Sequence, residues 1–282
     1  MRSLEHVAAL RALVAEWRNQ NLTIGLVPTM GSLHEGHRSL VKTAKKRFDR
    51  VIATIFVNPT QFSPGEDFDD YPRQIATDKA MLGEDGADAV FLPTIEDLYP
   101  RGVERTTLIT ISDLTNELCG AHRNGHFDGA MTAVNKLLNI TWPDAVFLGE
   151  KDFQQLFMIK QMVNELMMSV EVIGVPTYRE DDGLAMSSRN KYLTDAERSK
   201  ANTLYQILNE IQQALQSGSN DFLALEQQGL SKLQAVGFNP DYIEIRRQRD
   251  MLKAEPADTE LVVLGAAKLG RTRLIDNIQL SR

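Results

Sequence analysis

Cysteine and histidine are both scarce in this sequence. Its 282 residues include a single cysteine, Cys119, and five histidines. One cysteine forms no internal disulfide and no CxxC pair, which excludes a disulfide framework and a cysteine-based zinc site. We expect Cys119 to be a buried bystander thiol in a protein of a reducing compartment.

Long apolar runs and a basic surplus are also missing. No run of about eighteen apolar residues occurs, which argues against a membrane-spanning helix. Charged residues such as Glu5, Arg11 and Glu16 interrupt the first apolar pattern, unlike a signal peptide. The formal net charge is −7 and the pI is near 5.4, whereas a nucleic-acid backbone calls for a basic face. We expect a cytoplasmic protein that binds small molecules and neither nucleic acid nor membrane.

Short apolar runs rich in Val and Ile predict strands buried on both faces. They are residues 22–28, 50–59, 87–93, 144–150 and 170–176. An amphipathic helix opens the chain, and further helical patterns lie at 40–48, 73–86, 131–140 and 153–167. This alternation is typical of an α/β fold with a doubly wound parallel sheet, whose ligands bind beyond the carboxyl ends of the strands.

The pattern changes after Pro176. A polar, turn-rich segment is followed by helical stretches at 196–216 and 222–236, and then by strand-like runs at 241–247 and 260–267. This order predicts a smaller C-terminal α+β domain. We therefore predict a first domain over residues 1–176 and a second over 177–282.

The stretch LVPTMGSLHEGHRSL, residues 26–40, places two of the five histidines three residues apart after a strand. Gly31 permits a tight turn, and Ser32 with Glu35 fits a capping box, so we predict a helix that begins near Ser32. His34 and His37 then share the first helical turn, where free backbone N–H groups favour an anion such as a triphosphate. The alternatives are local capping by His34 and a core position for His37; a zinc site is weaker, because no third ligand is near.

Polar motifs follow other predicted strands. FVNPTQF brings the amides of Asn58 and Gln61, which can hold a hydroxyl or carboxylate, although Asn58–Pro59 also fits a simple turn. GEKDFQQ brings Lys151, which can neutralise phosphate, although a solvated helix start is the commoner role. MSSRN, residues 186–190, offers two hydroxyls and a guanidinium suited to an oxyanion; a plain polar loop is the alternative.

Taken together, these motifs resemble those of the pantothenate synthetases, the pantoate–β-alanine ligases of the HxGH nucleotidyltransferase group. The resemblance runs from about Val27 to Asn277 and rests on PTMGSLHEGH, FVNPTQF, YPR, GHFDGA, GEKDFQQ, MSSRN and RLIDN. HxGH alone is shared with other adenylyltransferases, but the remaining set is specific. Asn124 replaces a frequent proline, and GAMTAV replaces the usual GVxTVV; both changes affect packing more than reactive groups.

The resemblance implies a Rossmann-like domain with a C-terminal lid, and a cytoplasmic, homodimeric ligase of pantothenate biosynthesis. Pantoate and MgATP would give pantoyl-adenylate and pyrophosphate, and β-alanine would then displace AMP. No covalent enzyme intermediate is implied, and positioning with charge stabilisation can suffice for such transfer.

The resemblance also implies roles for individual residues. The catalytic set would be His34, His37 (the proton donor), Lys151, Ser187, Ser188 and Arg189. ATP would be bound by Met30, Gly31, Ser32, Leu33, His34, Glu35, Gly36, His37, Gly149, Glu150, Lys151, Asp152, Met186, Ser187, Ser188 and Arg189. Pantoate and β-alanine would be bound by Gln61, Gln155, Asn58, Arg123 and Tyr71. Asp78 is the candidate magnesium ligand, although ATP can supply most of the ligands.

Two other functions fit part of the pattern. A nucleotidyltransferase that leaves AMP on its product would share the HxGH turn, and product analysis separates it from a ligase. A catalytically silent nucleotide-binding or RNA-binding module is the other; the acidic balance and the lack of a basic aromatic stripe count against RNA.

Overall fold

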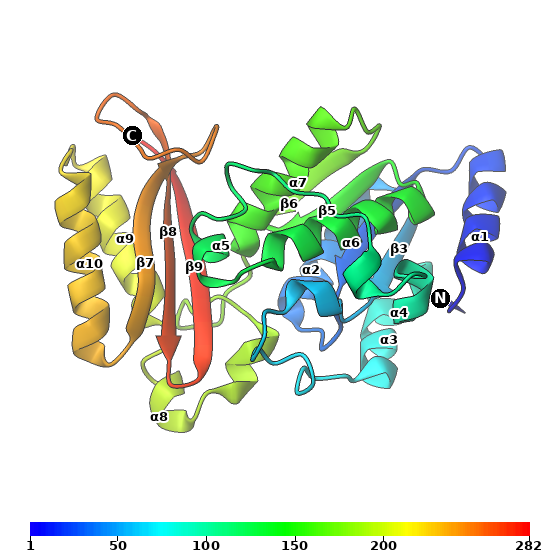
Figure 1. Cartoon of the computed structure of the whole chain (residues 1–282), viewed down its shortest axis with the longest axis horizontal. Coiled ribbons are helices and arrows are strands. Elements are labelled where there is room, and N and C mark those ends of the chain that lie inside the picture. The colour runs from blue at the N-terminus through cyan, green and yellow to red at the C-terminus, as the bar shows by residue number, and fades with distance from the viewer. The chain divides into compact units, whose positions relative to one another are not determined.

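The computed structural model describes residues 1–282, and their contacts divide the chain into two compact units. Unit 1 comprises Met1–Glu150 and Gln154–Pro176, and unit 2 comprises Lys151–Phe153 and Thr177–Arg282. Figure 1 shows the elements of both units. No helix has the length and apolar character needed to cross a bilayer.

Unit 1 is built on a six-stranded sheet in the order β1-β4-β3-β2-β5-β6, and every pairing is parallel. Its strands are β1 (Arg2–Leu4), β2 (Ile24–Thr29), β3 (Arg50–Ile55), β4 (Ala89–Phe91), β5 (Ala145–Gly149) and β6 (Glu171–Val175). Residues such as Leu26, Ile52 and Val146 are fully buried, as strands covered on both faces require. The predicted Rossmann-like parallel sheet is confirmed.

Helices cover this sheet and connect its strands (Figure 1). They are α1 (Val7–Asn19), α2 (Glu35–Arg47), α3 (Ile75–Glu84), α4 (Ile95–Leu98), α5 (Cys119–His122), α6 (His126–Thr141) and α7 (Phe153–Glu165), with 3-10 turns η1 (Pro59–Gln61), η2 (Val103–Arg105) and η3 (Glu150–Asp152). Helix α1 buries Leu10, Leu13, Val14 and Trp17, the spacing of one helical face. Burial of each large apolar side chain contributes about 1.5–3 kcal/mol.

Unit 2 is an α+β unit with an antiparallel sheet in the order β7-β8-β9. Its elements are η4 (Ser188–Tyr192), α8 (Asp195–Arg198), α9 (Thr203–Gln216), α10 (Phe222–Val236), β7 (Asn239–Arg247), β8 (Glu260–Leu269) and β9 (Thr272–Ser281). The core joins the apolar face of α9, including Ile207, Leu208 and Ile211, to one side of the sheet. The predicted smaller C-terminal α+β fold is therefore confirmed.

Several local predictions were incomplete. β1 was missed because three residues carry almost no pattern, and only pairing with β4 makes them a strand. β9 was missed because polar residues such as Asp276 interrupt its apolar alternation. The helix predicted at 196–216 is two helices, since a capping box between Thr194 and Glu197 starts α8, which ends at Arg198.

Candidate active site

The predicted motifs follow three neighbouring strands of unit 1. Strand β2 lies between β3 and β5, and all three run parallel. Their carboxyl ends therefore share one edge of the sheet, where Met30 follows β2, Asn58 follows β3 and Glu150 follows β5. The chain continues from β2 to β3 in one direction across the sheet and from β5 to β6 in the other. This edge is therefore a topological switch point, the usual ligand position in such folds.

The turn after β2 has a strained backbone that a buried carboxylate holds. Gly31 has φ +81° and Ser32 has φ +50°. A Cβ on Gly31 would lie 2.9 Å from Ile55 Cγ2 and 3.0 Å from Asp78 Oδ2, so this position needs glycine. Asp78 is 1% exposed, and its two oxygens accept from the backbone N–H groups of Ser32 at 2.9 Å and Leu33 at 2.8 Å.

The start of α2 corrects the sequence prediction. The helix begins at Glu35, and its N-cap is His34 rather than Ser32, whose left-handed backbone is incompatible with the predicted capping box. His34 Nδ1 accepts a hydrogen bond from the Gly36 N–H at 3.1 Å, so the neutral ring carries its proton on Nε2. The Glu35 carboxylate pairs with Arg38 at 3.1 Å.

The two histidines lie together at this helix end. Their ring centroids are 4.1 Å apart and the rings are inclined by 43°. Both residues are partly exposed, next to the backbone N–H groups of the first turn of α2. The local capping that was considered as an alternative for His34 is real, and it fixes the ring beside the anion-binding end of the helix.

A hydrogen-bonded group fixes the segment after β3. Asn58, 2% exposed, donates through Nδ2 to Gln61 Oε1 and to the Gly129 carbonyl, both at 3.1 Å. Its Oδ1 accepts from the Tyr99 hydroxyl at 2.7 Å and from the Thr60 hydroxyl at 2.9 Å. Burial raises the pKa of Tyr99, so this phenol stays protonated and able to donate. Gln61 Nε2 in turn contacts Met30 Sδ at 2.9 Å, which joins this segment to the turn after β2.

Helix α6 reaches the same segment through Gly129. A Cβ at this position would lie 2.0 Å from the Thr60 carbonyl oxygen, so only glycine allows the two backbones to approach. The roles of Gly129, in the GHFDGA motif, and of Tyr99 were not predicted from the sequence. The second glycine of that motif, Gly129, is the signal that could have indicated the close approach of α6 to the Thr60 backbone.

Arg123 is held in a second group around Gln61. Its guanidinium binds Glu66 through Nε and Nη2, both at 2.7 Å, and contacts His126 Nε2 at 2.8 Å. His126 Nδ1 is 2.6 Å from the Gln61 carbonyl oxygen, which fits a neutral ring protonated at Nδ1. Burial pulls the pKa of Glu66 upward, but the hydrogen bond and charge of Arg123 outweigh it and hold that pKa below its usual value.

The remaining unit 1 candidates are placed as follows. Tyr71 is 5% exposed, and its ring meets Phe62 edge to face at 5.8 Å. Gln155 is partly exposed near the start of α7. The preceding Gln154, for which the sequence predicted no role, is buried and bonded to the Cys119 N–H and to the carbonyls of Leu114 and Glu117, so its role is structural.

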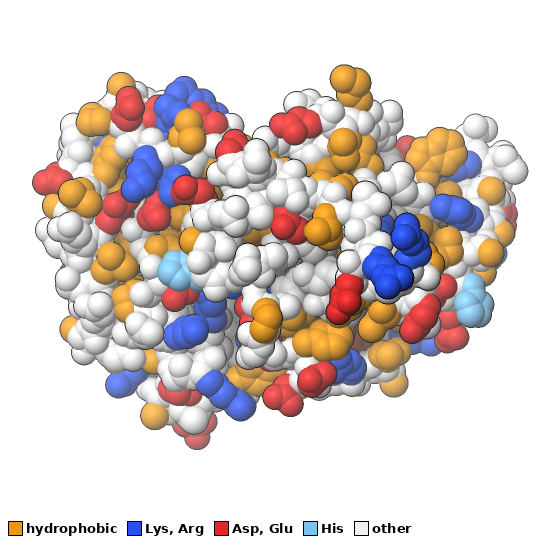
Figure 2. All heavy atoms as spheres, viewed as in Figure 1, with side chains coloured by type: hydrophobic (Ala, Val, Ile, Leu, Met, Phe, Trp, Pro, Cys, Tyr) orange, Lys and Arg blue, Asp and Glu red, His pale blue; other side chains and the backbone are white.

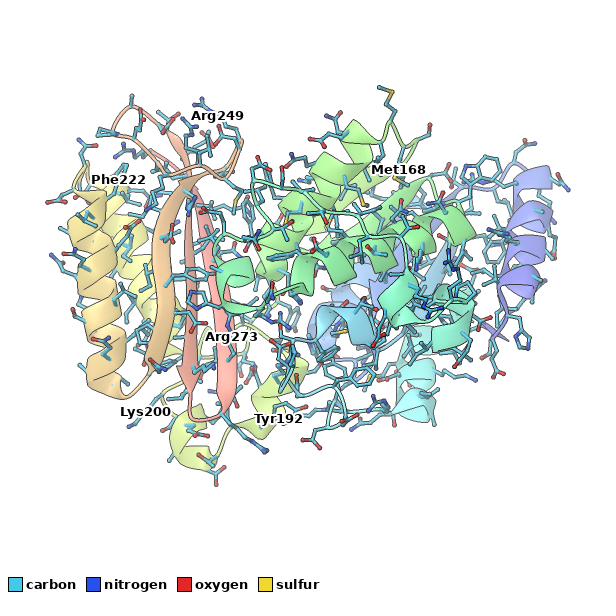
Figure 3. All side chains as sticks on the ribbon, viewed as in Figure 1. Met168, Tyr192, Lys200, Phe222, Arg249 and Arg273 are labelled. Carbon is cyan, nitrogen blue, oxygen red and sulfur yellow. The ribbon has the colours of Figure 1, made fainter.

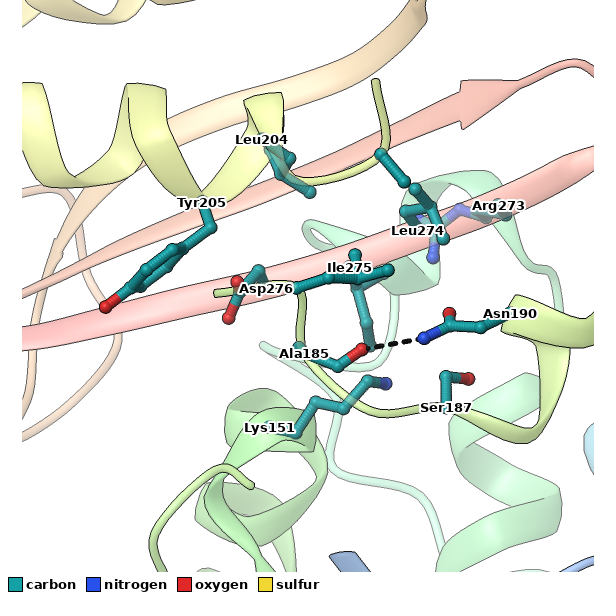
Figure 4. Close-up of a pocket in the computed structure, with 12 residues that line it drawn as sticks. Lys151, Ala185, Ser187, Asn190, Leu204, Tyr205, Arg273, Leu274, Ile275 and Asp276 are labelled. Atoms are coloured by element: carbon teal, nitrogen blue, oxygen red, sulfur yellow. Dashed lines mark hydrogen bonds between the residues drawn. The ribbon is translucent and has the colours of Figure 1, made fainter. Parts of the chain in front are cut away.

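In unit 2, Lys151 and Ser187 line one small cavity of about 20 Å³, room for a single water molecule. Figure 4 shows Lys151 extending beneath Ala185 towards Ser187, with Asp276 on β9 above them in the view. The Lys151 carbonyl accepts from Asn277 Nδ2 at 2.9 Å. Asp276 forms a two-pronged pair with Arg179 at 2.6 and 2.9 Å. Asn277 belongs to the late RLIDN motif, which therefore helps to hold the backbone at Lys151.

Ser187, Ser188 and Arg189 open the 3-10 turn η4. Ser187 is its N-cap and accepts from the Arg189 N–H at 3.3 Å. Asn190 fixes the turn by donating to Glu180 Oε1 at 3.0 Å and to the Ala185 carbonyl at 3.1 Å. Ser188 is buried and Arg189 partly exposed. The loop is therefore an ordered turn that presents its polar groups on a short rigid element.

No group of three or more His, Cys, Asp or Glu side chains is arranged to hold a metal ion. Asp78, the candidate magnesium ligand, already uses both oxygens for backbone N–H groups. Its observed task is to hold the turn after β2, and its role as a magnesium ligand stays a prediction.

Comparison with known proteins gives one consistent family. The pantoate-beta-alanine ligase family model matches residues 2–279. A pantothenate synthetase of Alkalilimnicola ehrlichii is 50% identical over 280 residues, which cover 99% of this chain and 98% of that protein. One from Azotobacter vinelandii is 49% identical over 280 residues, 99% of each chain.

Solved structures agree. The crystal structure of pantothenate synthetase from Thermus thermophilus matches with a TM-score of 0.93 and 39% identity, covering 100% of both chains. The pantoate-beta-alanine ligase of Francisella tularensis, solved in complex with beta-gamma ATP and beta-alanine, matches with a TM-score of 0.83 and 36% identity over 99% of this chain and 97% of that one.

Proposed function

The chain belongs to the pantoate-beta-alanine ligase family, and from this premise we propose how its own residues carry out the reaction of that family. The reaction is the ATP-dependent ligation of (R)-pantoate and β-alanine to pantothenate. The observation that carries the proposal is the placement of HxGH, FVNPTQF and the GEKDFQQ start after three adjacent parallel strands.

In the first half-reaction, the pantoate carboxylate attacks the α-phosphorus of ATP, which forms pantoyl-adenylate and releases pyrophosphate. Gln61 and Gln155 hold pantoate by amide hydrogen bonds, and His34 and His37 donate to the phosphates at the start of α2. His37 is the proton donor. Fixed donors of this kind stabilise charge as it develops and need no reorganisation.

Asn58, Arg123 and Tyr71 shape the pantoate and β-alanine site. Asn58 holds the Gln61 side chain, and Arg123 with His126 holds the Gln61 carbonyl. Because Arg123 is already engaged by Glu66 and His126, we assign it to positioning Gln61 rather than to a direct substrate contact. Tyr71 supplies a buried apolar wall.

Unit 2 contributes Lys151, Ser187, Ser188 and Arg189 to the phosphates and acts as a lid. The planar guanidinium of Arg189 can span two phosphate oxygens, and Lys151 adds a point charge. Residues 30–37, 149–152 and 186–189 line the ATP site, as the resemblance to the family implies. In the second half-reaction the β-alanine amine attacks the acyl carbon, and AMP leaves.

Magnesium enters as MgATP, with the phosphates as its main ligands. Magnesium usually keeps several waters and binds through substrate phosphates with one or two carboxylates, so ATP can supply most of its ligands. We further propose that the enzyme works in the cytoplasm as a homodimer, as the resemblance to its family implies.

Product analysis tests the proposal. With pantoate labelled by heavy oxygen in its carboxylate, we expect AMP and pyrophosphate in equal amounts, dependent on both pantoate and β-alanine, with one label per turnover in AMP. The label must pass to AMP because the bridging oxygen of the mixed anhydride leaves with it. ADP with labelled inorganic phosphate would instead show an acyl-phosphate route and remove the role given to the HxGH turn.

A further inference from the structure

Unit 1 contains a hollow that none of the residues predicted to bind substrates lines. Its volume is about 400 Å³, and its walls come from α1, from the segment between α4 and η2, and from α6. This volume lies within the range of about 300–1,000 Å³ that small-molecule sites occupy, and it is large for a single ion.

The charge of this hollow is opposite to that of the chain. Arg11, Arg101, Arg105 and Lys136 line it, against one carboxylate, Asp97. That carboxylate is already used in the capping box of α4, where it accepts from the Thr94 N–H at 2.9 Å and the Thr94 hydroxyl at 3.0 Å. Figure 2 shows Lys and Arg atoms gathered over the part of unit 1 where Figure 1 draws α4 and α6. In a chain of net charge −7, four cations around one hollow form a local positive field.

Three of the four cations have no partner within the protein. No ion pair and no hydrogen bond involves the side chain of Arg11, Arg101 or Arg105, and all three residues are exposed. Other arginines of unit 1 are paired, for example Arg18 with Asp144 at 2.8 Å and Arg38 with Asp85 at 2.7 Å. Uncommitted guanidiniums that line one hollow suit a bound oxyanion, because each can make two parallel hydrogen bonds to it.

The fourth cation is fixed on the wall of the hollow. Lys136 Nζ donates to the Leu98 carbonyl at 2.8 Å and to the Thr106 hydroxyl at 2.6 Å, and it lies 3.8 Å from the centre of the Tyr99 ring. An ammonium has three N–H donors, so one remains for a ligand. The hollow thus combines one charge held by hydrogen bonds with three that have no partner in the protein.

We propose that this hollow binds a small phosphorylated anion with at least two linked phosphate groups. Two linked phosphates carry more oxygens and more negative charge than one, so they offer acceptors to more of the three guanidiniums and the ammonium that line a hollow of about 400 Å³. A nucleic-acid backbone is a poor candidate because the chain as a whole is acidic.

Inorganic pyrophosphate is the probe, titrated by calorimetry at low salt into the full-length wild type and four variants. Arg101→Ser with Arg105→Ser alters the segment after α4, and Arg11→Ser independently alters α1. Lys46→Ser with Lys160→Ser removes two charges of unit 1 outside the hollow and is the matched control. Lys151→Ala weakens the ATP site only. Circular dichroism checks the fold of each.

We expect two classes of pyrophosphate site in the wild type and the charge-matched control. The double arginine variant should lose at least about tenfold in affinity at one class, and Arg11→Ser should weaken the same class, because charge-assisted hydrogen bonds are lost. Both should keep ligase turnover. Lys151→Ala should weaken only the other class. Orthophosphate should bind at least about tenfold more weakly to the hollow than pyrophosphate does.

Three results would overturn the proposal. The first is that the double arginine variant titrates like the charge-matched control. The second is that all pyrophosphate binding disappears in Lys151→Ala, which would mean that the ATP site alone was being measured. The third is equal binding of orthophosphate and pyrophosphate, which would remove the requirement for two phosphates. A Lys151→Ala protein with unchanged turnover would instead count against the function proposed above and leave the hollow intact.

Discussion

At the scale of single residues, Asp78 is the side chain on which the turn after β2 depends. It is 1% exposed and accepts two backbone N–H groups from a turn with two consecutive positive φ angles. Backbone N–H groups in a buried turn need hydrogen-bond partners, and a left-handed Ser32 is costly without such support.

We predict that Asp78→Asn weakens both ATP use and stability. One amide NH₂ would face a backbone donor, and a buried unsatisfied donor costs about 1–3 kcal/mol. KM for ATP should rise and the free energy of unfolding in urea should fall. Asp69→Asn, an exposed neighbour, is the control and should change neither quantity.

Added magnesium distinguishes the two possible roles of Asp78, which are support of the turn after β2 and binding of the metal ion. If the carboxylate only supports the turn, raising the magnesium concentration will not restore the activity of Asp78→Asn. Restoration by magnesium, with unfolding unchanged, would contradict the supporting role and favour the predicted metal ligand.

At the scale of elements, η1 is the piece that brings Gln61 to the sheet edge. Its N-cap Asn58 is fixed from two directions, by the Tyr99 hydroxyl that follows α4 and by the Gly129 carbonyl of α6. Three elements far apart in sequence therefore determine where one amide lies. A 3-10 turn of three residues has little stability of its own, so these contacts are needed to hold it.

Tyr99→Phe should raise KM for pantoate about two- to tenfold, because a net hydrogen bond is worth about 0.5–1.5 kcal/mol. Phenylalanine keeps the ring beneath Lys136, so the change isolates the hydroxyl. Steady-state kinetics with pantoate varied is the measurement, and Tyr178→Phe, which is 44% exposed, is the control. An unchanged KM would mean that Asn58 holds Gln61 without Tyr99.

At the scale of the whole molecule, each unit has its own apolar core. Unit 1 buries the central strands of the parallel sheet, with Ile52 fully enclosed, and unit 2 encloses Leu208 between α9 and its antiparallel sheet. Separate cores allow regions of a chain to open with different free energies. Figure 3 draws the side chains of both units, with Met168 labelled in unit 1 and Phe222 labelled in unit 2.

Leu208→Ala and Ile52→Ala form a matched pair, each expected to cost about 2–5 kcal/mol locally. Hydrogen exchange should show loss of protection in β7–β9 for Leu208→Ala and in β2, β3 and β5 for Ile52→Ala. If both variants lower protection equally in both sheets, the two units unfold as one cooperative block, contrary to this prediction.

Part of the fold and the candidate site could be predicted from local sequence. Doubly buried strands need continuous apolar runs, so five of the six strands of unit 1 were visible. The position of His34, Asn58 and Glu150 after parallel strands, at the carboxyl edge of one sheet, followed from the same pattern, whereas the adjacency of these strands came from the structure. The family motifs then indicated roles. A reactive side chain such as that of Lys151 or Arg189 can be recognised from its residue type, without knowledge of its position in the fold.

Tertiary structure decided what depends on distant partners. That His34 rather than Ser32 caps α2 follows from Asp78, a residue remote in sequence, whose carboxylate takes the backbone N–H groups of Ser32 and Leu33. Arg123 is engaged by Glu66 and His126, and Tyr99 supports Asn58, through hydrogen bonds that no local pattern encodes. The basic hollow exists only because α1 brings Arg11 to Arg101 and Arg105. Periodicity and residue type are local properties of the sequence, whereas the satisfaction of buried polar groups and the meeting of like charges are set by the packing of remote segments.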